Sequence, residues 1–201
     1  MERLGEVSLA VDDVVVYASH GVGRVAIRRQ ESVVVEFATG GLSVTLPIDR
    51  AAECIRPVST EAEIAGIAQT LAGAESPVES NWQRRLKAAR AKVAGGDAVG
   101  LAEVIRDASR RGERAIARSE PGKISLSERQ LYLKARQLLA DEIGAARGVD
   151  PALADEWIGD QIAVNADQEE RLPELRDQTR TAQPFEVMVE SSGNRARRRR
   201  H

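Results

Sequence analysis

Short apolar runs separated by turn residues occupy the N-terminal part of the chain. Runs rich in β-branched residues lie at residues 13–17, 22–27, 32–37 and 42–47, with glycine-containing turns among the connections. Such runs are typical of strands joined as antiparallel hairpins. Residues 1–58 are therefore predicted to form a small antiparallel barrel of about four or five strands.

After Pro57 the spacing of apolar residues changes from the period of a strand to that of a helix. Each helical stretch begins at a residue whose side chain can cap the first turn. The predicted starts are the capping boxes Thr60-x-x-Glu63, Ser80-x-x-Gln83 and Ser125-x-x-Glu128, then Asp97, and then Asp150 followed by Pro151. Residues 59–165 are therefore predicted to form an all-α domain of about five helices. The whole is an α+β chain of two domains.

Residues 166–201 are predicted to be an extension of these two domains. Pro173 and Pro184 interrupt the periodic pattern, polar residues dominate, and the sequence ends in SSGNRARRRRH. A basic, low-complexity end of this kind is typical of a disordered tail.

The second predicted helix concentrates positive charge. Residues 82–93 read WQRRLKAARAKV, with five basic residues and no acidic one. At about 100° per residue, its apolar members share one narrow stripe and the cations spread around the rest. The stripe is Trp82, Leu86, Ala89 and Val93, and the cations are Arg84, Arg85, Lys87, Arg90 and Lys92. Such a helix can be half buried and still offer cations to the phosphates of a nucleic acid.

The residues alone leave two interpretations of this helix open. Trp82 lies on the apolar stripe and can be the first core residue of its helix. An exposed indole at this position can instead stack on an unpaired base or wedge between base pairs. A basic helix face can likewise be merely solvated. Five arginines further along are expected to extend the basic surface: Arg106, Arg110, Arg111, Arg114 and Arg118. Three acidic residues near them dilute this surface: Glu103, Asp107 and Glu113.

Composition argues against several function classes. The chain of 201 residues has one cysteine and two histidines, which excludes an internal disulfide and a cysteine-based metal cage. It has no phosphate-binding glycine loop, no HExxH motif and no nucleophile elbow. We therefore predict no catalytic residue, no cofactor and no metal, and a protein that is not an enzyme.

Charge and hydropathy indicate the expected partners. The net charge of −2 hides a basic block at residues 76–147 that lies between acidic ones and is the candidate for binding a polyanion. No apolar run approaches the ~20 residues that a membrane span needs, and the N-terminus lacks a signal-peptide pattern. We expect a cytoplasmic protein that binds no membrane.

Segments of both predicted domains resemble, in the same order, the CarD/CdnL family of bacterial transcription regulators. The N-terminal segments are VDDVVVYASHGVGRV (11–25) and LSVTLPIDRAAE (42–53), from a module that transcription-repair coupling factors share. The helical segments are NWQRRLKAARAKVAGGD (81–97), AEVIRDASRR (102–111) and SLSERQLYLKARQLLADEI (125–143). Two domains that match in order make the resemblance specific.

The resemblance implies a Tudor/SH3-like barrel that binds the β subunit of RNA polymerase by pairing an exposed strand edge with a strand of the polymerase. The implied contact residues are Val44, Thr45, Leu46 and Pro47. It further implies a helical domain that contacts promoter DNA at the upstream edge of the transcription bubble and stabilises the open complex.

The resemblance also assigns roles on the basic helix. Trp82 matches the family's tryptophan, which acts as a wedge in the minor groove. Arg84 and Lys87 match basic residues that touch the DNA backbone, and Arg85 of the same helix completes the predicted DNA-binding set.

The chain departs from the family pattern in the polymerase-contact strand, where Thr45 stands in place of a frequent arginine. The loop after Ile27 is also short. Two alternative functions follow: a protein-interaction module of the same fold that binds another partner, and a polymerase-independent DNA-binding protein that uses the basic helix and the arginine tail. We expect a monomer.

Overall fold

The computed structural model places the described residues in one compact unit within residues 1–166, which we call unit 1. The residues that it describes are 9–18, 20–37, 41–76, 79–118 and 125–163. The predicted extension at residues 166–201, with its basic tail, lies outside them.

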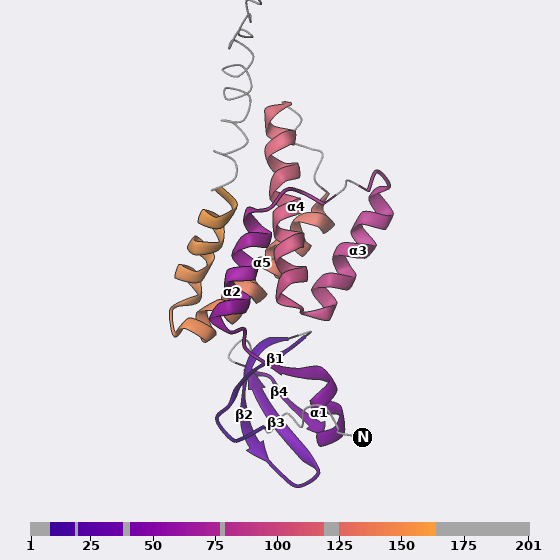
Figure 1. Cartoon of the computed structure of the whole chain (residues 1–201). Coiled ribbons are helices and arrows are strands. Elements are labelled where there is room, and N and C mark those ends of the chain that lie inside the picture. The colour runs from indigo at the N-terminus through magenta and orange to yellow at the C-terminus, as the bar shows by residue number, and fades with distance from the viewer. Residues whose placement is uncertain (1–8, 19, 38–40, 77–78, 119–124, 164–201) are drawn as a thin grey trace, which may run out of the picture. The chain divides into compact units, whose positions relative to one another are not determined.

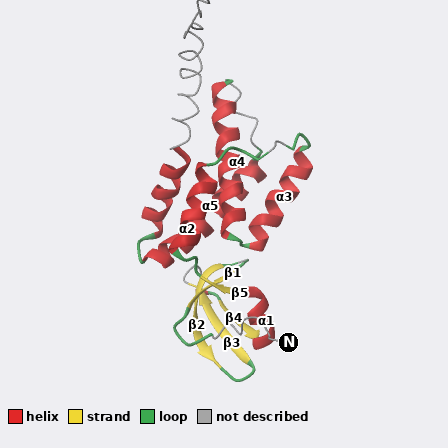
Figure 2. Ribbon diagram, viewed as in Figure 1, coloured by secondary structure: helices red, strands yellow, loops and turns green. Residues whose placement is uncertain are grey.

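The N-terminal strands form one five-stranded antiparallel sheet (Figure 1, Figure 2). They are β1 (Val14–Tyr17), β2 (Gly21–Arg28), β3 (Ser32–Phe37), β4 (Ser43–Pro47) and β5 (Ile55–Pro57), in the order β4-β3-β2-β1-β5. The β2–β3 register shifts between Val25 and Ile27. A bulge of this kind bends and twists a strand, which suits a small curved sheet. The predicted antiparallel β module is confirmed.

The inner face of the sheet carries the alternation expected of half-buried strands. Val33, Val35 and Phe37 of β3 are buried in one core with Val25 of the neighbouring strand β2 and Val15 of β1. The outward residues of β3 are half buried or exposed. A core this thin is typical of a small β domain.

One helix of the β module was not predicted. Residues 48–54, which we interpreted as part of a strand-rich region, form α1 (Ile48–Cys54), and Ala51 of this helix is fully buried in the β core. The interpretation was wrong because seven residues span only about two turns. Too few apolar positions repeat in that length to distinguish a helix from a strand.

The described residues after β5 are mostly helical, as predicted. Their helices are α2 (Glu61–Ala72), α3 (Trp82–Gly95), α4 (Ala98–Ala117), α5 (Leu126–Arg147) and a further helix at residues 151–163. Four of these helices supply side chains that are fully buried in one core: Ile64 and Ile67 of α2, Ile105 of α4, Leu139 of α5 and Ile158 of the last helix.

The predicted helix starts are confirmed with one exception. Thr60 with Glu63 and Ser125 with Glu128 form reciprocal capping boxes, and Asp97 caps α4. The predicted Ser80 box is wrong. Asn81 caps α3, and its side-chain oxygen accepts a hydrogen bond from the backbone N–H of Arg84 at 3.1 Å. Asparagine caps as well as serine does, and this start makes Trp82 the first helical residue.

Candidate nucleic-acid interface

The apolar stripe of α3 is buried except at its first member. Leu86 and Val93 are buried, and Ala89 packs against the helical core. Trp82 is 44% exposed and belongs to neither hydrophobic core. The interpretation of Trp82 as a core residue therefore lacks the packing it requires, and the indole lies at the surface of the first turn of α3.

The five cations of α3 divide into two groups. Arg85 donates from Nε to Glu128 Oε1 at 3.0 Å and from Nη1 to the carbonyl of Glu79 at 3.0 Å. Lys92 pairs with Glu103 at 2.7 Å. The other three cations are exposed and have no ion-pair partner among the residues that the structure describes: Arg84, Lys87 and Arg90. At about 100° per residue these three share one flank of the helix, and the two paired cations lie on the other.

Glu128 anchors the first turns of α3 to α5. Its side chain is buried, and Oε2 accepts hydrogen bonds from Ser125 N at 3.2 Å and from Ser125 Oγ at 3.0 Å. Burial by itself raises the pKa of Glu128, but the hydrogen bonds from Arg85 and Ser125 outweigh it and hold the pKa below its usual value. The carboxylate therefore stays charged, and Arg85 is bound within the protein next to the exposed Trp82.

The predicted polymerase-contact residues lie on an edge strand. Among the described strands β4 pairs only with β3, so it is an edge strand, the kind of strand to which another can be added. Val44 and Leu46 pack against the β core, whereas Thr45 and Pro47 are exposed. The opposite edge, β5, is different because Arg56 of that strand binds Glu142 of α5. β4 and β5 are thus the two edges of the described sheet, and β4 is the one that carries the predicted contact residues.

Two family models match the chain in succession. The CarD-like/TRCF RID domain model matches residues 9–59, which include the whole described sheet, and the CarD C-terminal domain model matches residues 66–159. The chain belongs to the CarD/CdnL family. Members of this family are transcription factors that interact with RNA polymerase.

The expected extension of the basic surface of this CarD-family chain onto α4 is wrong for Arg106 and Arg110, whereas Arg114 and Arg118 are exposed. Arg106 and Arg110 are each only 7% exposed. The guanidinium of Arg106 donates to Asp107 Oδ1 at 2.8 Å, to Ser76 Oγ at 2.7 Å and to the carbonyl of Thr70 at 3.3 Å. These bonds tie α4 to the end of α2 and to the segment that follows it, so Arg106 cannot contact DNA.

The next arginines of α4 are also engaged within the protein. Arg110 donates to the carbonyl of Ile162 at 3.5 Å, and Arg114 pairs with Glu75. Arg111 lies 3.7 Å from Glu75 and 4.0 Å from Glu128. Sequence reasoning missed these pairs because each joins residues more than ten positions apart, and no local spacing predicts which helices will pack together.

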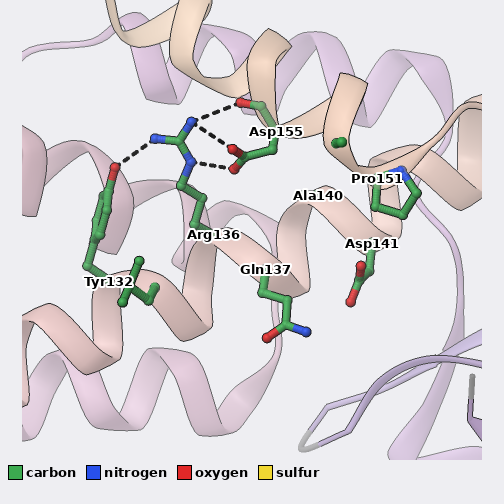
Figure 3. A pocket seen from close by; sticks show the side chains of 9 residues that line it. Tyr132, Arg136, Gln137, Ala140, Asp141, Pro151 and Asp155 are labelled. Atoms are coloured by element: carbon green, nitrogen blue, oxygen red, sulfur yellow. Dashed lines mark hydrogen bonds and ion pairs between the residues drawn. The ribbon is translucent and has the colours of Figure 1, made fainter. Parts of the chain in front are cut away.

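A groove lies between α5 and the helix at residues 151–163 of this CarD-family chain, with a volume of about 510 Å³ (Figure 3). Arg136 crosses it and bonds to both oxygens of the Asp155 carboxylate, to the Asp155 carbonyl at 3.0 Å and to Tyr132 Oη at 2.7 Å. These polar atoms satisfy one another and hold the last helix on α5. Burial raises the pKa of Asp141 at the rim of the groove.

Two further kinds of feature are absent from the described ranges. No group of three or more His, Cys, Asp or Glu side chains within them is arranged to hold a metal ion. No helix within them is both long and apolar enough to cross a bilayer.

Proposed function

We propose that this chain binds the β subunit of RNA polymerase through the open edge of β4 and promoter DNA through α3. In this proposal it contacts the minor groove at the upstream edge of the bubble and stabilises the open complex. It acts as a cytoplasmic, monomeric regulator and catalyses no reaction.

The observation that supports this function most strongly is the surface around Trp82. An indole in the first turn of a helix, 44% exposed, lies on the same helix as three cations that lack partners among the described residues. Lys87 and Arg84 can neutralise phosphates and give affinity that does not depend on base sequence. The indole can enter a base step where the duplex is kinked. Arg85, bound to Glu128, positions this turn instead of contacting phosphate.

The effect on the promoter follows from differential binding. A protein that binds closed and open promoter complexes with equal affinity does not shift the equilibrium between them. Contacts of Trp82 that exist only with kinked or opened DNA favour the open state, and about 1.4 kcal/mol of such preference gives a tenfold shift. The DNA contacts of a single helix are weak alone. They become effective when polymerase binding raises their local concentration.

The edge of β4 supports the polymerase contact. When a strand is added to a sheet edge, main-chain hydrogen bonds supply affinity and alternate side chains supply specificity. The outward residue at the centre of β4 is Thr45, which can pack beside an added strand but offers no charge. We therefore assign the contact to the backbone of β4 and to its outward side chains.

The test measures binding of purified bacterial RNA polymerase and the lifetime of the open complex at one promoter. Trp82→Ala should retain polymerase binding and lose the lifetime extension by about tenfold. Ile116→Ala, at a position on α4 that is 74% exposed, is the matched control and should behave as wild type. Loss of both activities on Trp82→Ala together with loss of helical signal contradicts the proposal.

That experiment, together with a gel shift on duplex DNA without polymerase, separates the two alternative functions. A chain that binds another protein partner will not capture polymerase and will leave the lifetime unchanged. A polymerase-independent DNA-binding protein will shift a duplex in a gel without polymerase, and deletion of residues 191–201 will abolish that shift.

A further inference from the structure

A buried carboxylate lies where the β module meets the helices of unit 1. Glu142 of α5 is 1% exposed. Its Oε1 accepts from Arg56 Nη1 at 2.5 Å and from the N–H and Oγ of Ser59 at 3.1 and 2.6 Å, and its Oε2 accepts from Arg56 Nη2 at 2.8 Å. Arg56 also donates to the carbonyl of Gly96 at 2.9 Å. We call Arg56, Ser59 and Glu142 the clamp.

Two close backbone approaches surround the clamp. Gly96, at the end of α3, has φ 64°, and a Cβ there would lie 2.5 Å from Ala18 Cα of the loop after β1. Gly21, at the start of β2, has φ 85°, and a Cβ there would lie 2.8 Å from Leu138 Cδ2 of α5. Both positions therefore require glycine for conformation and for space. The β module thus contacts α5 and the α3–α4 turn at several points.

The covalent connection alone does not set this arrangement. Only residues 58–60 separate β5 from α2. A linker this short limits the distance between the β module and the helices, but the torsions of three residues still allow them to rotate. The two-pronged contact of Arg56 with Glu142 is directional because the planar guanidinium fits a carboxylate in one geometry.

This ion pair, with Glu142 buried and Arg56 partly exposed, is a weak source of stability, because taking the Glu142 charge out of water offsets much of the attraction between the two groups. The ion pair instead fixes geometry, because only one arrangement of the β module and α5 gives the Glu142 carboxylate all four of its hydrogen-bond donors. Rotation of the β module away from this arrangement would separate Arg56 from Glu142 and leave the buried carboxylate without its counterion. Alternative orientations of the β module are therefore disfavoured.

We propose that the clamp is a positioning device that holds the open β4 edge and Trp82 in one fixed relation. This inference rests on the proposed function. Polymerase bound at β4 then delivers the indole to one place on the DNA, and the DNA contact becomes part of the same binding event. Without the clamp, the chain still binds polymerase but presents Trp82 over many orientations.

The test compares four full-length variants with wild type. Glu142→Gln removes the buried charge but keeps an acceptor for Ser59. The double variant Arg56→Gln with Glu142→Gln removes both charges, so neither charge is left without its partner. Arg56→Lys keeps the charge but loses the two-pronged contact. The control, Arg50→Gln, removes a positive charge from the β module by breaking the exposed Arg50–Glu53 pair.

Three quantities are measured for each protein. Backbone 15N relaxation reports whether the β module and the helices tumble as one body. Polymerase affinity reports the β4 contact, and open-complex lifetime reports the delivery of Trp82. For Glu142→Gln and the double variant we expect separate tumbling, polymerase affinity within about twofold of wild type and a lifetime extension reduced about tenfold. Arg56→Lys should be intermediate, and Arg50→Gln should match wild type.

The outcomes separate this inference from the proposed function. If wild type neither binds polymerase nor extends the lifetime, the proposed function fails, and the relaxation data alone still decide whether the clamp couples the two parts. If the variants tumble as one body, the clamp does not set the orientation and the inference is overturned. Separate tumbling with a full lifetime extension overturns it as well, because fixed orientation is then unnecessary.

Discussion

α3 and α4 are both rich in basic residues, yet the structure uses their charges in opposite ways. On α4, Arg106 and Arg110 are buried and bonded to neighbouring elements. On α3, three of the five cations are exposed and unpaired among the described residues. α3 contains no acidic residue, whereas α4 contains Glu103, Asp107 and Glu113. Basic content therefore does not identify an interface; the supply of internal acceptors decides which cations remain free for a partner.

The two tryptophans show the same contrast for apolar surface. Trp157 packs against the helical core, and the guanidinium of Arg147 lies 4.6 Å from its ring centre. Trp82 belongs to neither core cluster and lies on the same helix as three exposed cations. The packed apolar surface of Trp157 stabilises the fold, whereas the exposed apolar surface of Trp82 is available to a ligand.

The largest effect is expected on removal of a buried cation of α4. Arg106→Ala leaves the acceptors at Thr70, Ser76 and Asp107 without their donor, so the free energy of unfolding should fall by about 2–4 kcal/mol. Arg84→Ala on α3 should change it by less than ~0.5 kcal/mol. Urea unfolding followed by far-UV circular dichroism measures both. Equal effects of the two substitutions would remove the distinction between the helices.

The next effect is expected from Glu128, which pairs with a cation of α3. Glu128→Gln should lower the free energy of unfolding at pH 7 by about 1–2 kcal/mol, because a hydrogen-bonded ion pair becomes a neutral contact. The folded-state pKa of Glu128 is depressed, so its contribution is full above the usual value of 4.5 and is lost as the pH falls through the lower folded value. The difference between wild type and variant should therefore shrink below about pH 4.5. A difference that grows on acidification would contradict this assignment.

A smaller effect is expected for Trp82, and it concerns DNA instead of stability. Trp82→Ala should shorten the open-complex lifetime about tenfold, equivalent to about 1.4 kcal/mol, while the free energy of unfolding changes by less than ~1 kcal/mol. Trp157→Ala should do the reverse and destabilise the fold by about 3 kcal/mol. Thermal unfolding and promoter-lifetime assays on both variants test the contrast.

The smallest effect is expected for the exposed cations of α3. Arg84→Ala or Lys87→Ala should each reduce the salt dependence of DNA binding in the polymerase complex by about one counterion, with the largest loss of affinity at low salt and a smaller loss as the salt concentration rises. Arg110→Ala, if the variant folds, should leave this slope unchanged. An unchanged slope for both α3 variants would mean that these cations are only solvated.

Much of the fold could be predicted because its signals are local. The capping boxes at Thr60 and Ser125 and the alternating strand at residues 32–37 each lie within a few residues, and the structure confirms them. α1 was not predicted because a helix of about two turns contains too few apolar positions to show a helical period. The cap of α3 was misplaced by one residue because Ser80 and Asn81 are both good caps and only the backbone geometry selects between them.

The candidate site was only partly predictable from sequence. Helical spacing placed Trp82 on one stripe with Leu86 and Val93. It could not show where along that stripe contact with the core ends. It could not separate Arg85, which binds Glu128, from its exposed neighbours, because that pair joins residues 43 positions apart. The long-range contacts of Arg106 and of the clamp could not be predicted for the same reason, because contacts between elements depend on packing that no local pattern encodes.

The central claim is that the first turn of α3 touches promoter DNA when the chain is bound to polymerase. A photocrosslinking amino acid placed at position 82 tests this most directly in the assembled promoter complex, with the same group at position 116 on α4 as the control. We predict crosslinks from position 82 to DNA at the upstream edge of the bubble and none from position 116. Crosslinks from position 116 alone, or from position 82 only to polymerase, would contradict the claim.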